Sequence, residues 1–190
     1  MASGCAVGVI DGPGELGTID LAPSGLHRLT RLEYDNTIRD LLGDNSRPSV
    51  TFTFPPDEFG DGFNNNADVL TLSPLNVEKY LTAARTLMST ALAAGTPSRA
   101  RIMVCDPSAV ACPRRIVTEF ARRAFRRPVA DAEIDPYLKL IDRAKAGGDT
   151  FERGLQLALQ AVLVAPDFLF RVELDPAPGI EHDLDPYELA

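Results

Sequence analysis

The sequence has no apolar run long enough to cross a membrane. Its longest strongly apolar stretch, residues 155–165, is interrupted by Gln160, and it is far shorter than the roughly 18 residues that a membrane-spanning helix needs. Histidine is also scarce, because His27 and His182 are the only two and they lie far apart. We expect both on the surface rather than as ligands. Motifs of serine hydrolases, metalloproteases and phosphate-binding loops are absent, so the sequence names no reaction.

Basic residues are outnumbered: 19 Lys and Arg stand against 27 Asp and Glu, which gives a net charge of -8. General binding of nucleic acid requires a basic surface, so this class of function is excluded. Apolar residues make up 45% of the chain and charged residues 24%, close to the averages of globular proteins. A chain of 190 residues is long enough for one domain or two very small ones, so we expect a folded core.

There are three cysteines, and each carries a specific expectation. Cys5 follows Met-Ala-Ser-Gly, so it is either the lipidated residue at the end of a bacterial lipoprotein signal or an incidental cysteine. Cys105 and Cys112 are too far apart for a redox Cys-x-x-Cys pair and lack the second pair of a zinc site. We predict a disulfide between them, which requires an oxidising compartment. The alternative is two reduced cysteines that flank a turn.

Helical spacing and capping residues predict a mainly α fold, an irregular bundle of about five helices with at most one short strand. A capping box, Thr30 with Glu33, begins the first helix, and Gly43 ends it. Ser73 with Pro74 begins the second. The third follows Pro113, and the others lie within residues 131–146 and 149–165. We expect the fourth helix to start at Asp135 or to bend at Pro136. Residues 101–105 should form a strand or an extended crossing. Residues 167–172 should form an apolar turn. The leucines expected to face the core are Leu32, Leu41, Leu42, Leu75, Leu81, Leu87 and Leu92.

The chain divides into four expected parts. Residues 1–27 form a flexible leader, and residues 28–98 a helical pair with a long Asp/Asn/Phe-rich loop. Residues 99–174 form a disulfide-linked helical segment, and residues 175–190 an acidic tail in which Asp185 and Pro186 begin another helix. Because a five-residue helix is unstable alone, we expect a longer protein or a second chain to complete it.

The loop at residues 57–68 is the leading candidate site. Seven side chains within twelve residues carry oxygen atoms, and Gly60 and Gly62 let the backbone curl. Calcium prefers six to eight oxygen ligands from such loops, so we predict a possible calcium site at Asp57, Glu58, Asp61, Asn64, Asn66 and Asp68. The alternative is a solvated turn that Phe54, Phe59 and Phe63 anchor to the core.

A second candidate is the arginine cluster Arg122, Arg123, Arg126 and Arg127. Residues 99–128 carry eight arginines against two acids, whereas residues 167–190 carry seven acids against one arginine. The basic segment either binds an anionic polymer or lipid surface, or pairs internally with the acidic tail. We favour the internal pairing.

Three segments together resemble a known family: residues 28–43, residues 122–129 and residues 154–173, which ends in Ala-Pro-Asp-Phe-Leu-Phe-Arg-Val-Glu. They are similar to large modular envelope proteins of planctomycetes and myxobacteria, built from successive domains of unknown function. The resemblance covers residues 28–190 and implies a helical fold and secretion or envelope attachment, but no established activity. Some members carry c-type cytochrome segments. This chain has no Cys-x-x-Cys-His, so covalent haem within it is excluded.

The sequence therefore favours a structural or binding module of a larger bacterial envelope protein. It would lie in the periplasm, at the outer membrane or outside the cell, with the remaining part of the protein or a second chain as partner and with a possible lipid anchor. One alternative is the non-catalytic portion of a redox or hydrolytic envelope enzyme whose active groups lie beyond residue 190. Another is a calcium-stabilised adhesion or carbohydrate-binding module. No cofactor is certain.

Overall fold

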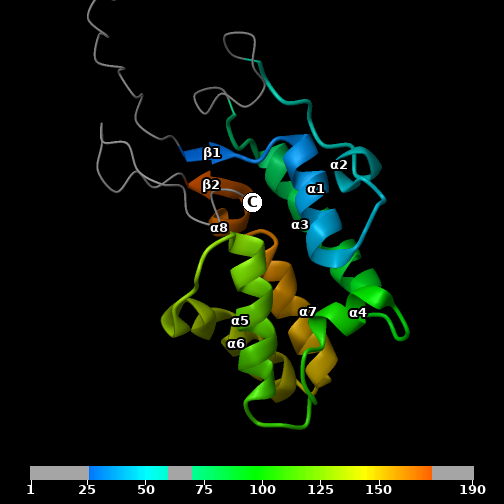
Figure 1. The fold of residues 1–190 in the computed structure, drawn as a ribbon, viewed down its shortest axis with the longest axis vertical. Coiled ribbons are helices and arrows are strands. Elements are labelled where there is room, and N and C mark those ends of the chain that lie inside the picture. Colours follow the sequence, from blue (N-terminus) through cyan, green and yellow to red (C-terminus); the bar gives the residue numbers. More distant parts are fainter. Residues whose placement is uncertain (1–25, 60–69, 173–190) are drawn as a thin grey trace, which may run out of the picture.

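The computed structural model describes residues 26–59 and 70–172, which form eight helices and a two-stranded antiparallel sheet (Figure 1). The order of elements is β1 (Leu26–Arg28), α1 (Arg31–Leu42), α2 (Pro48–Thr51), α3 (Pro74–Ala91), α4 (Pro97–Ile102), α5 (Cys112–Phe125), α6 (Asp131–Ala146), α7 (Phe151–Val162), α8 (Pro166–Leu169) and β2 (Phe170–Val172). Five of these helices have 12 or more residues. The predicted mainly α fold is confirmed. Within the described ranges, no helix has the length and apolar character required of a membrane span.

The predicted helix caps are also confirmed. The Thr30 hydroxyl accepts a hydrogen bond from the Glu33 backbone N–H at 3.2 Å, and the Glu33 carboxylate accepts one from the Thr30 N–H at 2.8 Å. Gly43 ends α1 with φ at +75°, a left-handed conformation that glycine adopts without strain. Ser73 caps α3 and Thr150 caps α7.

Three leucines expected in the core are exposed. Leu32 is 63% exposed, Leu75 49% and Leu81 47%. Leu32 lies two residues before Tyr34, which is on the buried face of α1, and residues two apart on a helix do not share a face. Leu75 and Leu81 lie outside the buried face of α3, which contains Tyr80, Ala84 and Leu87. An apolar side chain is therefore not a sufficient sign of burial.

Of the two alternatives predicted for residues 101–105, the strand is wrong: α4 extends to Ile102, and residues 103–105 belong to no helix or strand. Thr96 accepts from the Arg99 N–H and Pro97 occupies the first turn, so a helix, α4, forms up to Ile102. The sheet instead pairs β1 with β2, with Leu26 opposite Val172 and Arg28 opposite Phe170. The expected leader through residue 27 thus overlaps β1, and the expected turn at residues 167–172 is replaced by α8 and β2.

Helix α6 begins at Asp131, earlier than expected. The Ala130 backbone N–H donates to the Glu133 carboxylate at 2.7 Å, which caps the helix start. Pro136 lies inside the helix, where its missing N–H leaves the Ala132 carbonyl without its usual donor. The helix nevertheless continues to Ala146.

A single hydrophobic core joins the two halves of the chain. Rings of Tyr34, Phe54, Tyr80 and Phe168 lie with centroids 5.0 to 5.9 Å apart. They come from α1, the segment after α2, α3 and α8 respectively. Helix α7 packs against α3, α5 and α6, and its residues Leu155, Ala158, Leu159 and Val162 are fully buried. Helix α7 is therefore the central helix, and the expected segments 28–98 and 99–174 share one core.

Candidate binding groove

The predicted disulfide is present between Cys105 and Cys112. It closes a short loop in which the Ser108 hydroxyl and backbone N–H both donate to the Asp106 carboxylate, at 2.8 and 2.9 Å. These bonds lower the pKa of Asp106. The Cys112 N–H donates to the Ala109 carbonyl at 2.9 Å, so the loop is held in a defined shape directly before α5.

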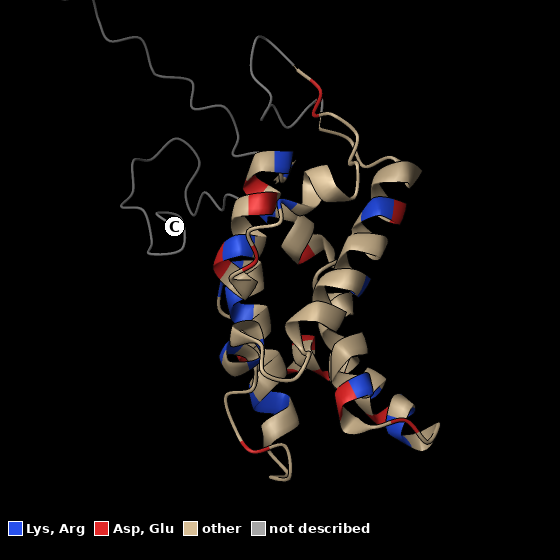
Figure 2. Ribbon diagram, turned by 90° about the vertical axis from the view of Figure 1, so that its right-hand side faces the viewer, with Lys and Arg blue, Asp and Glu red and all other residues tan. Residues whose placement is uncertain are grey.

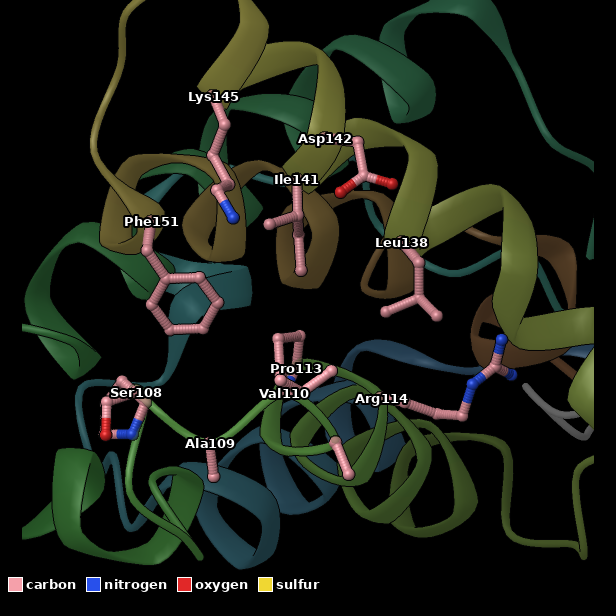
Figure 3. A pocket seen from close by; sticks show the side chains of 12 residues that line it. Ser108, Ala109, Val110, Pro113, Arg114, Leu138, Ile141, Asp142, Lys145 and Phe151 are labelled. Atoms are coloured by element: carbon pink, nitrogen blue, oxygen red, sulfur yellow. The ribbon is translucent and has the colours of Figure 1, made fainter.

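This loop forms one wall of a groove of about 560 Å³. Side chains of α6 form the opposite wall, Phe151 at the start of α7 closes one end, and Pro113 lies at the base of the loop (Figure 3). The size lies within the range of ligand sites. The larger apolar side chains that line it include Leu138, Ile141, Phe151, Pro113 and Val110.

Charged side chains lie along the rim of the groove. At one end, the Arg114 guanidinium donates to the Asp135 carboxylate at 2.6 Å and lies 3.3 Å from an Asp131 oxygen. Both acids raise the pKa of Arg114. Asp142 and Lys145 also face the groove (Figure 3), and neither makes an ion pair or hydrogen bond through its side chain within residues 26–59 and 70–172. The groove therefore combines an apolar floor with an acid and a base, Asp142 and Lys145, whose side chains have no polar partner among the described residues.

The arginines predicted as a binding cluster make internal contacts. Arg122 lies 3.0 Å from Glu119, and Arg123 donates to the carbonyls of Asp40 and Leu41 at 3.1 and 3.0 Å. The Arg123 contacts satisfy carbonyls at the end of α1, where a cation is favoured. Figure 2 shows basic and acidic segments interspersed along the helices.

Arg126 and Arg127 join the end of α5 to the C-terminal part of the fold. Arg126 donates to the carbonyls of Phe168 and Phe170 at 3.0 and 3.2 Å. Burial, with a smaller effect from Arg171, lowers the pKa of Arg126 to about 10. Arg127 contacts Glu133 at 2.6 Å and Asp167 at 2.5 Å. Internal pairing therefore occupies these arginines, while the acidic tail beyond residue 172 lies outside the described residues.

The predicted calcium site falls mostly outside the described residues, since Asp61, Asn64, Asn66 and Asp68 lie within residues 60–69. Asp57 is described, and both its carboxylate oxygens are engaged. One accepts from the Arg28 guanidinium at 3.2 Å and the other from the Arg31 backbone N–H at 2.8 Å. The Arg28 and Asp57 side chains are only 5% and 9% exposed. Calcium binding stays a prediction.

The anchoring aromatic residues and the histidines differ from expectation. Phe54 is buried, but Phe59 is 72% exposed, and Phe63 lies outside the described residues.

The His27 side chain, expected on the surface, is only 12% exposed and lies 3.6 Å from the Glu33 carboxylate, because β1 pairs with β2 and holds it against α1. His182 and Cys5 also lie outside the described part of the chain.

Sequence reasoning missed the groove. Its residues come from three separate segments, and along α6 the order Leu138, Ile141, Asp142 and Lys145 is what an ordinary amphipathic helix shows. The one available signal was the predicted disulfide, which fixes the loop beside α5.

These features define a disulfide-containing helical module with a surface groove. Comparison with protein families then finds two successive domains. Residues 27–93 match the family PSD3, a protein of unknown function (DUF1587), and residues 112–173 match PSD5, a protein of unknown function (DUF1595). Neither curated proteins nor solved structures gave a match. The groove loop lies between the two matched regions, whereas α6 and α7 lie within the second.

Proposed function

We propose that this chain is a binding module of a larger bacterial cell-envelope protein, which acts in the periplasm, at the outer membrane or outside the cell. The observation that carries the proposal is the Cys105–Cys112 disulfide. Such bonds persist in oxidising compartments and are rare in the reducing cytosol of most bacteria.

The way in which the two matched domains pack supports a single module. β1, at the edge of the PSD3 match, pairs with β2 in the PSD5 match. Arg123 on α5 caps the end of α1, and the ring cluster takes residues from both matches. The two matched domains therefore share one hydrophobic core.

The groove favours a binding role over a purely structural one. A structural module gains nothing from an open apolar groove beside unpaired charges, because exposed apolar surface is costly. The resemblance to envelope proteins of planctomycetes and myxobacteria supports the location rather than an activity.

Cell fractionation tests the proposal. An antibody against the native protein should detect it in the periplasmic, outer-membrane or extracellular fraction of the source cells, with a cytosolic enzyme as the marker for leakage. Recovery with the cytosolic marker alone would contradict the proposal.

A further inference from the structure

The groove has the length of a short extended peptide. Its α6 wall runs from Leu138 to Lys145, eight residues whose seven helical steps span about 10 Å at 1.5 Å per residue. Three residues of extended chain cover about the same distance. The groove therefore accommodates roughly three residues of an extended peptide lying along α6.

One residue of the loop wall, Val110, has backbone groups without a partner in the described part of the chain. The Val110 backbone N–H and carbonyl take part in no hydrogen bond within residues 26–59 and 70–172, and the Val110 side chain is fully exposed. The neighbouring Ala109 is engaged, since its N–H donates to the Asp106 carbonyl and its carbonyl accepts from Cys112. The Val110 N–H and carbonyl therefore have no partner among the described residues of the fold.

The side chains select a particular pattern of residues. Side chains of an extended segment alternate between two faces, so the first and third residues point one way and the second points the other way. Asp142 and Lys145 lie one helical turn apart on the rim, whereas Ile141, Leu138 and Phe151 form the apolar surface beside them (Figure 3). A segment whose outer side chains meet the two charges thus directs its middle side chain toward the apolar surface.

We propose that the groove binds an extended segment of another protein in which one apolar side chain stands between a basic and an acidic side chain. The basic side chain pairs with Asp142 and the acidic one with Lys145, while the apolar side chain packs on Leu138, Ile141 and Phe151. This inference rests on the proposed function, and it adds the class of partner that the module recognises. Charge complementarity favours such a segment over an anionic lipid surface, because one of the two free charges is itself an acid.

NMR titration with blocked tripeptides tests the inference. The oxidised protein is titrated with acetyl-Lys-Leu-Glu-amide and with acetyl-Glu-Leu-Lys-amide, since the backbone can run in either direction. We expect saturable shifts in the resonances of Leu138, Ile141 and Phe151 with at least one of the two. Exposed ion pairs contribute little each, so the neutral acetyl-Gln-Leu-Gln-amide should bind roughly 2- to 30-fold more weakly. Acetyl-Lys-Gly-Glu-amide, which lacks the apolar side chain, should also bind more weakly.

Two variants separate the groove from the rest of the surface. Asp142→Asn combined with Lys145→Gln alters exposed side chains that make no hydrogen bond or ion pair with the described residues. It should therefore leave the melting temperature unchanged and weaken peptide binding by the same 2- to 30-fold range. The matched control is Lys139→Gln, an exposed change on the same helix outside the groove, which should bind as the unaltered protein does.

Several results would overturn the inference. These are shifts that map away from the groove, no saturable shifts, equal affinity for the neutral peptide, and unchanged affinity in the double variant. If the resonances of groove residues shift as the protein concentration rises in the absence of peptide, a second copy of this chain occupies the groove. That result also contradicts the inference. None of these results bears on the location of the protein, which fractionation tests separately.

Discussion

Helix α7 lies close against α6 at Gly154, and the substitution Gly154→Ala tests how rigid that contact is. A Cβ atom at this position would lie 3.0 Å from the Ile141 Cα, 3.1 Å from the Ile141 carbonyl oxygen and 3.2 Å from the Ala144 Cβ. Two of these three atoms belong to the backbone of α6, so no side-chain rotation relieves the crowding. The helices must separate by a few tenths of an ångström.

Two opposing effects set the size of the change. In an exposed helix, replacing Gly by Ala stabilises by about 1 kcal/mol. Overpacking in a close-packed interior costs about 1 to 3 kcal/mol, and contact with backbone places Gly154 in the upper half of that range. We therefore expect Gly154→Ala to lower the free energy of unfolding by about 1 to 2 kcal/mol.

Urea unfolding followed by circular dichroism measures this difference. Thermal melting should show a decrease of about 2 to 8 °C, the shift expected for a chain of this size. A stabilisation of about 1 kcal/mol would refute the reasoning, since it would mean that helix propensity outweighs the contact with Ile141. Because Ile141 also lines the groove, the same variant should shift the resonances of groove residues.

Three further predictions concern charge and the disulfide. Asp57→Asn leaves the guanidinium of Arg28 buried without its counter-charge, and urea unfolding should show a loss of about 3 to 5 kcal/mol. Glu33 has a pKa lowered from 4.5 to about 2, chiefly by its contact with His27 and then by the donors of Thr30. The stabilising effect of the ionised Glu33 carboxylate is therefore complete above pH 4.5 and is lost as the pH falls through 2. The difference in unfolding free energy between the unaltered protein and Glu33→Gln should accordingly decrease as the pH is lowered from 4.5 to 2. Replacing Cys105 and Cys112 together by Ala should lower the free energy of unfolding by about 2 to 3 kcal/mol, the entropy of closing so short a loop.

Each of these predictions has a control and a contradictory outcome. Asp40→Asn removes a partner from Arg39 in an exposed pair, 49% and 71% accessible, and should change stability by less than about 1 kcal/mol. If Asp57→Asn and Asp40→Asn lose similar amounts of unfolding free energy, the burial of the Arg28–Asp57 pair has no effect on stability. A pH-independent difference between Glu33 and its Gln variant would contradict the assigned pKa. Equal melting of the unaltered and Ala-substituted proteins under oxidising conditions would contradict the contribution of the disulfide.

Local signals allowed the helices to be predicted from sequence. The Thr30 and Glu33 capping box, Ser73 with Pro74, and Gly43 each act within a few residues of the chain, so a sequence pattern is enough to place them. The disulfide was also predictable, because Cys105 and Cys112 lie close together and the other known uses of such pairs did not fit.

The sheet and the groove could not be predicted because both depend on residues distant in sequence. β1 pairs with β2 across most of the chain, and three-residue strands carry no alternating pattern that would reveal them. Leu32 and Leu81 fit the helical spacing but lie outside the buried faces, since apolar residues also occur on surfaces. Lys145 and Asp142 become neighbours of the loop at residues 107–111 only when α6 packs beside α5.

The central claim is that the Cys105–Cys112 bond exists in the protein as cells make it. The native chain should be purified without reductant, denatured in the presence of iodoacetamide and digested for mass spectrometry. After cleavage before Asp106, we predict that the peptides containing Cys105 and Cys112 remain joined and that iodoacetamide modifies neither of these two cysteines. Alkylation of both Cys105 and Cys112 would contradict the claim.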